Sequence, residues 1–221
     1  TQVLTLFPYT TLFRSSLNQA LVLGYVDRNV AAGKYVRLPA YRRVRRRALS
    51  EAEVNSILAA ARGKKGELLV KFLLFSGARP AEALGLQFGA IESGFVRIER
   101  SLTWPRGQGF VLKEPKTVNG TRHVPITIEL SELFREVRKS RMQLESSTSP
   151  FVFQTSRGTP YDIAGARRQL IDPILREAGI GKDITPYCFR HTAASLMVKA
   201  GVPLSVIAKI LGHYDSRFTA A

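Results

Sequence analysis

Four cationic residues stand at predicted element boundaries, where they could act together on a phosphate. Arg79 lies between two predicted helices in SGARPAEALGL, and Lys116 lies in a predicted β-hairpin in PKTVNGTRHVPI. Arg190 begins a predicted helix in TPYCFRHTAASL, and His213 ends another in LGHYD. Arginine forks bind phosphate oxygens and stabilise the charge that grows during phosphoryl transfer, while lysine can protonate a leaving oxygen. If the four groups converge, they predict a phosphoryl-transfer site.

Each of these residues also has a purely structural interpretation. Arg79 could pair with Glu82, which stands one turn further along the predicted helix. Lys116 could be an exposed turn lysine, and His213 could cap a helix through the helix dipole. The sequence offers no carboxylate cluster for catalytic magnesium, and its three histidines lack metal-ligand spacing, so we predict chemistry without metal or cofactor.

The charge of the chain points to a polyanionic partner. Its 221 residues include 33 Lys and Arg against 17 Asp and Glu, a formal net charge of +16, which favours nucleic acid. The single cysteine, Cys188, excludes a disulfide framework and a cysteine-based zinc site. No stretch approaches the roughly 18–20 apolar residues of a membrane span, and no secretory signal is present. We therefore expect no membrane contact and a cytoplasmic location.

The elements that must position the four residues begin with a series of helices. Ser50 and Glu53 have the spacing of a capping box, which predicts a helix start. Residues 67–75 are nearly all apolar, so we expect the next helix to be the central core helix. Pro80 fits the first turn of a short helix that runs to Leu86.

Strand-like periodicity follows over three segments, residues 95–100, 109–113 and 122–126. Asn119-Gly120 is a strong hairpin signal between the last two. Further helices are predicted at residues 130–144, 162–178, 190–200 and 203–211, and a short buried strand at 151–153. We therefore predict a mainly α fold with a small three-stranded antiparallel β-sheet (α+β).

The first 47 residues are predicted to lie outside the main folded unit. Residues 1–15 include TLFPYTTLFRS, which resembles the translation of a common sequencing-library adapter, so we interpret them as an artefact. Residues 16–32 hold one helical stripe without a partner, which indicates the last helix of a truncated domain. Residues 33–47 form a basic linker suited to lie along a DNA backbone. The candidate DNA-binding residues are Arg42, Arg43, Arg45, Arg46, Arg47, Arg167 and Arg168.

Residues 48–221 resemble the catalytic domain of the tyrosine recombinases, the phage-integrase family, without its extreme C-terminus. The four sequence segments quoted above carry the resemblance, because they follow in the family's order and spacing. Residues 17–30 are similar to the last helix of the family's core-binding domain. The residues that the resemblance assigns to catalysis are Arg79, Lys116, Tyr187, Arg190 and His213, with Glu82 and His191 as structural support.

Two features depart from the family's pattern. Tyr187 stands where the family most often has histidine, three residues before Arg190. A phenol can hydrogen-bond to a phosphate oxygen, but its ordinary pKa of about 10 makes it a poorer general base. The family's nucleophilic tyrosine lies further beyond the position of His213 than this chain extends, so we expect it just past Ala221. The chain as given is therefore expected to bind DNA without cleaving it.

The resemblance implies site-specific recombination or integration of double-stranded DNA by two transesterifications. A tyrosine attacks the scissile phosphate, and Lys116 protonates the departing 5′-oxygen. The resulting 3′-phosphotyrosyl link allows rejoining without a metal or cofactor. Self-association on DNA, as a tetramer in the family, is implied as well.

Two alternatives remain open at the level of sequence. The segment HTAASLMVKAGVPLSVIAKILGH could be the helix-turn-helix of a DNA-binding regulator without catalysis, with Gly201 in the turn. That interpretation explains the charge but gives no reason for Arg79 and Lys116. A type IB topoisomerase-like enzyme would use the same chemistry as a recombinase, although the lone helix and short sheet favour the recombinase.

Overall fold

The computed structural model describes residues 6–32, 47–105, 107–114, 121–142, 149–181 and 183–212. The chain divides into two compact units, Thr1–Arg45 and Arg46–Ala221, each of which is considered by itself. Within the described parts of the chain, no helix combines the length and apolar character needed to span a bilayer.

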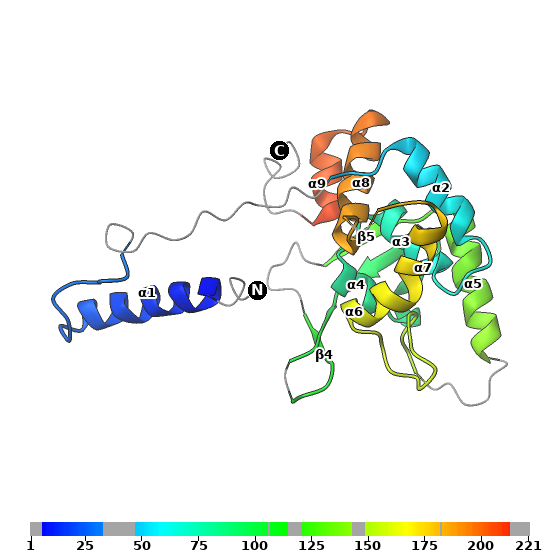
Figure 1. The fold of residues 1–221 in the computed structure, drawn as a ribbon. Helices are drawn as coiled ribbons and strands as arrows, with labels where there is room; N and C mark the ends of the chain where they lie inside the picture. The colour runs from blue at the N-terminus through cyan, green and yellow to red at the C-terminus, as the bar shows by residue number, and fades with distance from the viewer. Residues whose placement is uncertain are drawn as a thin grey trace. The chain divides into compact units, whose positions relative to one another are not determined.

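The first unit contains helix α1 (Leu6–Val22) and a turn that folds back on it (Figure 1). The side-chain amide of Asn29 fixes this turn, because it donates to the carbonyl of Arg14 (2.9 Å) and to Oδ1 of Asn18 (2.6 Å). The helix starts well before residue 16, contrary to the sequence-based prediction. The interpretation of residues 1–15 as adapter-derived stays a prediction.

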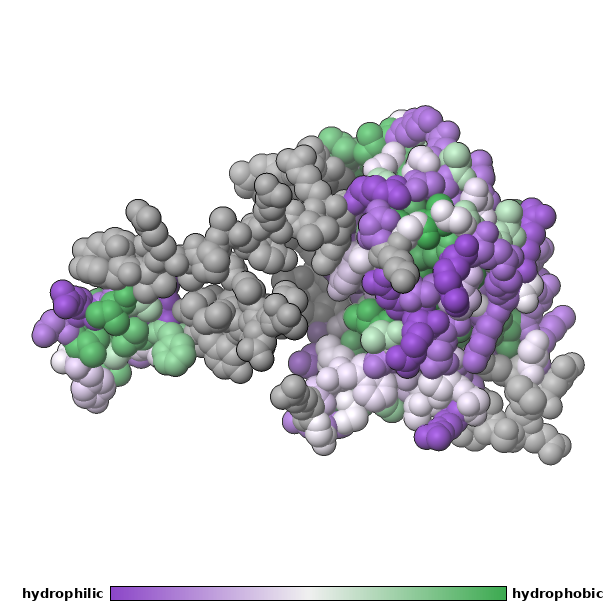
Figure 2. Space-filling model, viewed as in Figure 1, coloured by the Kyte–Doolittle hydropathy of each residue, from purple (hydrophilic) through white to green (hydrophobic). Residues whose placement is uncertain are grey.

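Apolar side chains lie at the surface of this first unit (Figure 2). They are Phe13, Leu21, Val22, Leu23, Tyr25 and Val30. Exposed apolar surface of this kind is typical of an element that packs against further protein. The assignment of residues 16–32 to a truncated domain agrees with this exposure and remains a prediction.

Helix α3 (Glu67–Ser76) lies at the centre of the second unit, as its apolar sequence predicted (Figure 1). Nearly every side chain of α3 is buried. The helix packs against α2 (Glu51–Ala61), α5 (Ile128–Met142) and α8 (Pro186–Lys199). One apolar core therefore joins segments from the beginning and the end of the unit.

Local signals set the ends of the first helices. The predicted capping box of α2 is confirmed, because Ser50 Oγ accepts from the backbone N–H of Glu53 and the Glu53 carboxylate accepts from that of Ser50. Gly77 ends α3 at a φ of 60°, in the left-handed region that favours glycine. Helix α4 (Pro80–Leu84) follows at once, with Arg79 as its N-cap.

Two small antiparallel sheets follow α4. In the first, β2 (Phe95–Ile98) is the middle strand, between β1 (Ile91–Glu92) and β5 (Arg122–Pro125). In the second, β3 (Ser101–Thr103) pairs with β4 (Val111–Lys113). A three-stranded antiparallel sheet is thus confirmed.

The predicted membership of that sheet was wrong for one strand. The segment expected at residues 109–113 pairs with β3, and the third strand is the short β1. The hairpin signal Asn119-Gly120 lies outside the described residues. Residues 151–153 are buried as expected, but they form only an isolated bridge, from Phe151 to Gln87, instead of a strand.

The helix predicted at residues 162–178 is present, with a wider turn in its middle. It consists of α6 (Ile163–Ala166), the π-helical turn η4 (Arg167–Ile171) and α7 (Asp172–Glu177). Pro173 has no N–H for the regular α-helical hydrogen bond, which accounts for the local change in winding.

Helices α8 and α9 (Leu204–Leu211) close the second unit. Helix α8 begins at Pro186, so Arg190 lies inside the helix. The prediction that Arg190 begins this helix was wrong. The N-cap Thr185 and a first-turn proline explain the earlier start. The described residues form a mainly α fold with small antiparallel sheets, which confirms the predicted fold class.

Candidate functional site

Arg79 stands at the N-terminus of α4, in the turn that Gly77 opens and Pro80 closes. Its backbone N–H donates to Glu82 Oε2 and its guanidinium Nη1 donates to Oε1, both at 2.8 Å. The Arg79 side chain is 40% exposed. Among the described residues only Glu82 binds this guanidinium. The outer edge of the Arg79 guanidinium therefore faces solvent, where it can donate hydrogen bonds to an anion.

Glu82 is the carboxylate on which the site is built. It is buried, and it binds the guanidinium of Arg122 through two hydrogen bonds as well as that of Arg79. Burial alone would raise the pKa of Glu82, but the hydrogen bonds and charge of Arg122, with the hydrogen bonds from Arg79, lower it below its ordinary value. Glu82 is therefore ionised and holds two arginines at once.

Arg122 begins strand β5 and was not identified as a site residue from the sequence. Its side chain lies on the inward-facing side of the strand, with Val124, while His123 and Pro125 are exposed. Its Nε also donates to the carbonyl oxygen of Ile210 in α9, at 2.7 Å. The available signal was an arginine at an inward-facing position of an alternating strand, because a buried charge needs a buried partner.

Arg190 reaches from α8 into the same cluster. Its Nη1 donates to the carbonyl of Gly77 (2.8 Å) and its Nη2 to the carbonyl of Leu211 (2.7 Å). Burial, together with the like charge of Arg79, lowers the pKa of Arg190 to about 10, although the charge of Glu82 acts in the opposite direction. The positive charges of this site are therefore close enough to repel one another.

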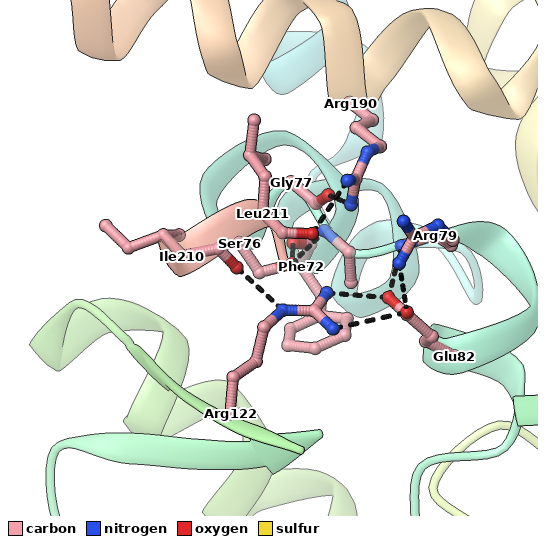
Figure 3. A network of polar contacts seen from close by, with 10 residues as sticks. Phe72, Ser76, Gly77, Arg79, Glu82, Arg122, Arg190, Ile210 and Leu211 are labelled. Atoms are coloured by element: carbon pink, nitrogen blue, oxygen red, sulfur yellow. Dashed lines mark hydrogen bonds and ion pairs between the residues drawn. The ribbon is translucent and has the colours of Figure 1, made fainter. Parts of the chain in front are cut away.

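Figure 3 shows the carboxylate of Glu82 bound by Arg79 and Arg122, while the guanidinium of Arg190 binds the carbonyls of Gly77 and Leu211; we call the three arginines the arginine cluster. Arg79, Arg122 and Arg190 come from α4, β5 and α8, which are far apart in the sequence. Within the described residues this cluster has more positive than negative charge, and its members are mostly buried. Such an arrangement favours the binding of an anion that can accept several hydrogen bonds, as a phosphate does.

The other sequence-predicted site residues occupy varied positions. Tyr187 is half-buried on α8, three residues before Arg190. His191, expected to give structural support, is exposed on the same helix. Lys116 and His213 lie outside the described residues, so their convergence with the two arginines stays a prediction.

The candidate DNA-binding arginines also differ in their surroundings. Arg47 binds the carboxylate of Glu53 with both Nη atoms (2.8 and 2.7 Å) and that of Asp183 with Nε (2.9 Å). Arg167 pairs with Asp172 at 3.1 Å, and Arg168 is exposed. The remaining linker residues, Arg42, Arg43, Arg45 and Arg46, lie outside the described residues.

A metal-binding cluster and a reactive thiol find no support in the described parts of the chain. No group of three or more His, Cys, Asp or Glu gathers there in a way that could hold a metal ion. Cys188 is buried in α8, and its sulfur accepts from the backbone N–H of Thr185 at 3.3 Å. Cys188 thus has the structural surroundings expected for a packed thiol.

The sequence profile of the phage integrase family matches residues 47–221, which include every residue of the arginine cluster. The chain belongs to the phage integrase family. Curated relatives of this phage integrase family member include the "Tyrosine recombinase XerC-like" protein of Caldanaerobacter subterraneus subsp. tengcongensis, which is 26% identical. That alignment covers 94% of this chain and 58% of the relative.

A second relative of this family member is the transposase from transposon Tn916 of Enterococcus faecalis, 27% identical over 77% of this chain and 46% of the relative. The chain spans about half the length of the curated relatives it matches. Among solved structures, the Tn1549 transposon integrase in complex with a circular intermediate DNA is similar, with a TM-score of 0.80 and 20% identity. This match covers 97% of this chain and 73% of the other, and it shows the shared fold.

Proposed function

We propose that this chain is part of an enzyme of a mobile genetic element that recombines or integrates double-stranded DNA at specific sites. The supporting observation is the convergence of Arg79 and Arg190 on a cluster with excess positive charge. Membership of the phage integrase family and the likeness to a transposase and a transposon integrase support the same function. An enzyme that acts on chromosomal DNA works where that DNA is, which for this chain we take to be the cytoplasm.

The cluster can perform the electrostatic part of strand cleavage. The outer edge of Arg79 and the inner face of Arg190 bind the non-bridging oxygens of the scissile phosphate, with Tyr187 donating a further hydrogen bond. As a tyrosine oxygen forms its bond to phosphorus, the bond from phosphorus to the 5′-oxygen breaks, and charge grows on the bound oxygens. Fixed guanidiniums stabilise that charge without reorganisation. His213 completes the set of hydrogen-bond donors, with Glu82 and His191 as structural support.

Lys116 has a separate role in this proposal, because it protonates the departing 5′-oxygen. The proton that the lysine gives is taken back when the strand is rejoined, since rejoining reverses the same steps. The covalent 3′-phosphotyrosyl link stores the phosphodiester bond between the two steps, so no cofactor is required. This role rests on the sequence resemblance, because Lys116 lies outside the described residues.

DNA binding depends on the charge of the whole chain. With 33 Lys and Arg against 17 Asp and Glu, contacts to the DNA backbone release counterions, so affinity should fall steeply with salt. The linker arginines, with Arg167 and Arg168, are proposed to contact the backbone and to position the protein. Recombination brings two duplexes together, so we also propose that several copies of the chain associate on DNA.

A selected DNA duplex tests the proposal. The full chain is incubated with a random duplex pool, and the bound DNA is sequenced to find an enriched site. Hydrogen peroxide then serves as an external nucleophile, so that the assay does not depend on which residue attacks. We expect strand breakage at one phosphate of the selected site. Arg79→Lys and Arg190→Lys should each reduce the breakage rate about 10²–10³-fold.

DNA affinity provides the discriminating control. Both arginine variants should keep DNA affinity within a few-fold, and Arg97→Lys should behave like the wild type, because Arg97 forms half-exposed ion pairs with Glu92 and Glu99. Tight binding without breakage at any enriched site would overturn the proposal. Relaxation of a supercoiled plasmid without a required site would indicate a topoisomerase.

The helix-turn-helix regulator remains a second candidate, favoured by one observation. Helices α8 and α9 are joined by a short turn in which Gly201 has a φ of 78°. Against it, Arg190 of α8 points into the arginine cluster and binds two backbone carbonyls there. A regulator would show the binding without breakage described above.

A further inference from the structure

Arg122 joins two parts of the site that are distant in the sequence. Its Nη2 donates to Glu82 Oε2 at 2.7 Å and its Nη1 to Oε1 at 3.2 Å. Its Nε donates to the carbonyl of Ile210, at the end of α9. One guanidinium therefore holds both the carboxylate that orients Arg79 and the helix end that precedes Gly212.

The C-terminal end of α9 is bound by two guanidiniums. Arg122 binds the carbonyl of Ile210, and Arg190 binds the carbonyl of Leu211. The last carbonyls of a helix have no partner within the helix and carry the negative end of its dipole, so cations stabilise them. The end of α9 thus serves as a common backbone support for Arg122 and Arg190 (Figure 3).

Gly212 brings the backbone directly against Arg122. It has a φ of 67°, in the left-handed region. A Cβ at this position would lie 3.0 Å from Nη1 and 3.1 Å from Cδ of Arg122. Only a glycine lets the chain pass this close to the guanidinium without displacing it.

The guanidinium of Arg122 is buried and directed to groups of the protein itself. Its side chain is 6% exposed, whereas that of Arg79 is 40% exposed. Its hydrogen bonds to Glu82 and to the carbonyl of Ile210 hold the guanidinium to groups within the protein. It can therefore influence the phosphate through Arg79 and Arg190, whose positions depend on the groups that it holds.

We propose that Arg122 is a positioning residue that sets the spacing of Arg79 and Arg190, by holding Glu82 and the end of α9 with a single guanidinium. This inference rests on the proposed function for its effect on DNA breakage. The claim that Arg122 holds the end of α9 does not rest on the proposed function, because the attachment of α9 can be measured without DNA. Lysine cannot replace Arg122, since one ammonium on a flexible stem cannot form the same three directed hydrogen bonds.

The first experiment measures the attachment of α9 in the free full chain. Hydrogen–deuterium exchange is followed in peptides that cover α9 and α3, for the wild type, Arg122→Lys and the control Arg97→Lys. We expect Arg122→Lys to speed exchange at the C-terminal end of α9 at least tenfold, with α3 unchanged. Unchanged exchange in α9 would overturn the inference, even if the wild type breaks DNA as proposed.

The second experiment is a double-mutant cycle in the peroxide breakage assay at saturating DNA. Arg122→Lys should slow breakage at least tenfold and change DNA affinity less than threefold. Combined with Arg79→Lys it should add less than a threefold further loss, because both changes disturb the same phosphate contact. Losses that multiply would overturn the inference and indicate that Arg122 binds the phosphate independently.

Gly212→Ala tests the same contact by changing the residue whose backbone lies against Arg122. It should reproduce the fast exchange of α9 and the slow breakage of Arg122→Lys, which guards against a folding defect peculiar to either variant. A Gly212→Ala protein with wild-type exchange and breakage would count against the inference. If the wild type breaks no selected DNA, the proposed function fails, while the exchange experiment still decides whether Arg122 holds α9.

Discussion

Glu82 and Arg122, 40 positions apart, form a bidentate ion pair, and their side chains are only 9% and 6% exposed. The pair connects helix α4 to strand β5. Arg79, whose side chain is partly exposed, binds the same carboxylate. The buried pair therefore fixes the position of an arginine that faces solvent. Removing the carboxylate would leave two guanidiniums without their shared acceptor.

Glu82→Ala should therefore be strongly destabilising. The substitution removes the carboxylate from the buried Arg122 charge, and breaking a buried ion pair in this way costs about 3–5 kcal/mol. The free energy of unfolding is measured by urea denaturation. Glu92→Ala is the matched control, because Glu92 pairs with Arg97 at the surface, where such pairs contribute about 0–1 kcal/mol. Equal losses in the two variants would contradict the assigned role of Glu82.

The parts of this fold that sequence could predict are those with local causes. The capping box at Ser50 and Glu53 needs only residues three apart, and the apolar run of α3 has no stable place except the core. The predicted pairing of β4 with β5 was wrong, because it rested on Asn119-Gly120, a turn signal that is local to the segment between the two strands. Which strand a segment joins depends on contacts with distant residues, such as those between β2 and β5.

The candidate site also contains residues that the sequence could identify and one that it could not. Arg79 and Arg190 could be identified from family-like segments, but nothing in their spacing predicts that they meet. Arg122 was missed because its role depends on two distant partners, Glu82 and the carbonyl of Ile210. A backbone carbonyl has no sequence signature, so such a contact is visible only once the chain is folded.

An inorganic anion should bind at the arginine cluster and stabilise the fold. Inorganic phosphate at constant ionic strength should raise the unfolding temperature, because it brings a negative charge to a guanidinium whose pKa is lowered to about 10 by burial and by the charge of Arg79. A ligand at a hundredfold excess over its Kd adds about 2.7 kcal/mol. Arg190→Gln should lose most of this effect, while Arg176→Gln, on an exposed position, should keep it. Equal stabilisation of both variants would place phosphate elsewhere.

The stability contribution of Glu53 should depend on pH. Hydrogen bonds from Arg47 and from the backbone of Ser50 lower the pKa of Glu53 to about 2. A carboxyl group whose pKa is lower in the folded state stabilises the fold above its unfolded pKa, about 4.3, and this is lost as the pH falls through 2. Glu53→Gln should thus be less stable than the wild type at pH 7, and the gap should narrow below about pH 4.5.

Urea denaturation at several pH values measures this gap. In the Arg47→Gln background, Glu53→Gln should have a smaller effect, because the main cause of the lowered pKa is gone. A gap that stays constant from pH 7 to pH 2.5 would show that the ion pair between Arg47 and Glu53 does not contribute to stability.

The role of Lys116 can be tested by changing the leaving group. Lys116→Ala should slow breakage of ordinary DNA about 10²–10⁴-fold, because the 5′-oxygen departs without a proton donor. A duplex with sulfur in place of that bridging oxygen should restore most of the rate, since a thiolate leaves without protonation. Arg79→Lys should show no such rescue, because its effect is on the non-bridging oxygens. Rescue of both variants, or of neither, would contradict the assignment.

Gly66 should be the least replaceable glycine in the turn between α2 and α3. A Cβ there would lie 2.0 Å from the backbone carbonyl oxygen of Leu170 in η4, which cannot move as a side-chain tip could. Gly66→Ala should therefore cost about 1–3 kcal/mol or more in the free energy of unfolding, as overpacking does. Gly89→Ala is the matched control, because a Cβ there meets no atom within 4 Å. It should be close to neutral in urea denaturation, and a similar loss in both variants would show that backbone freedom, and not the approach of Leu170, requires the glycine.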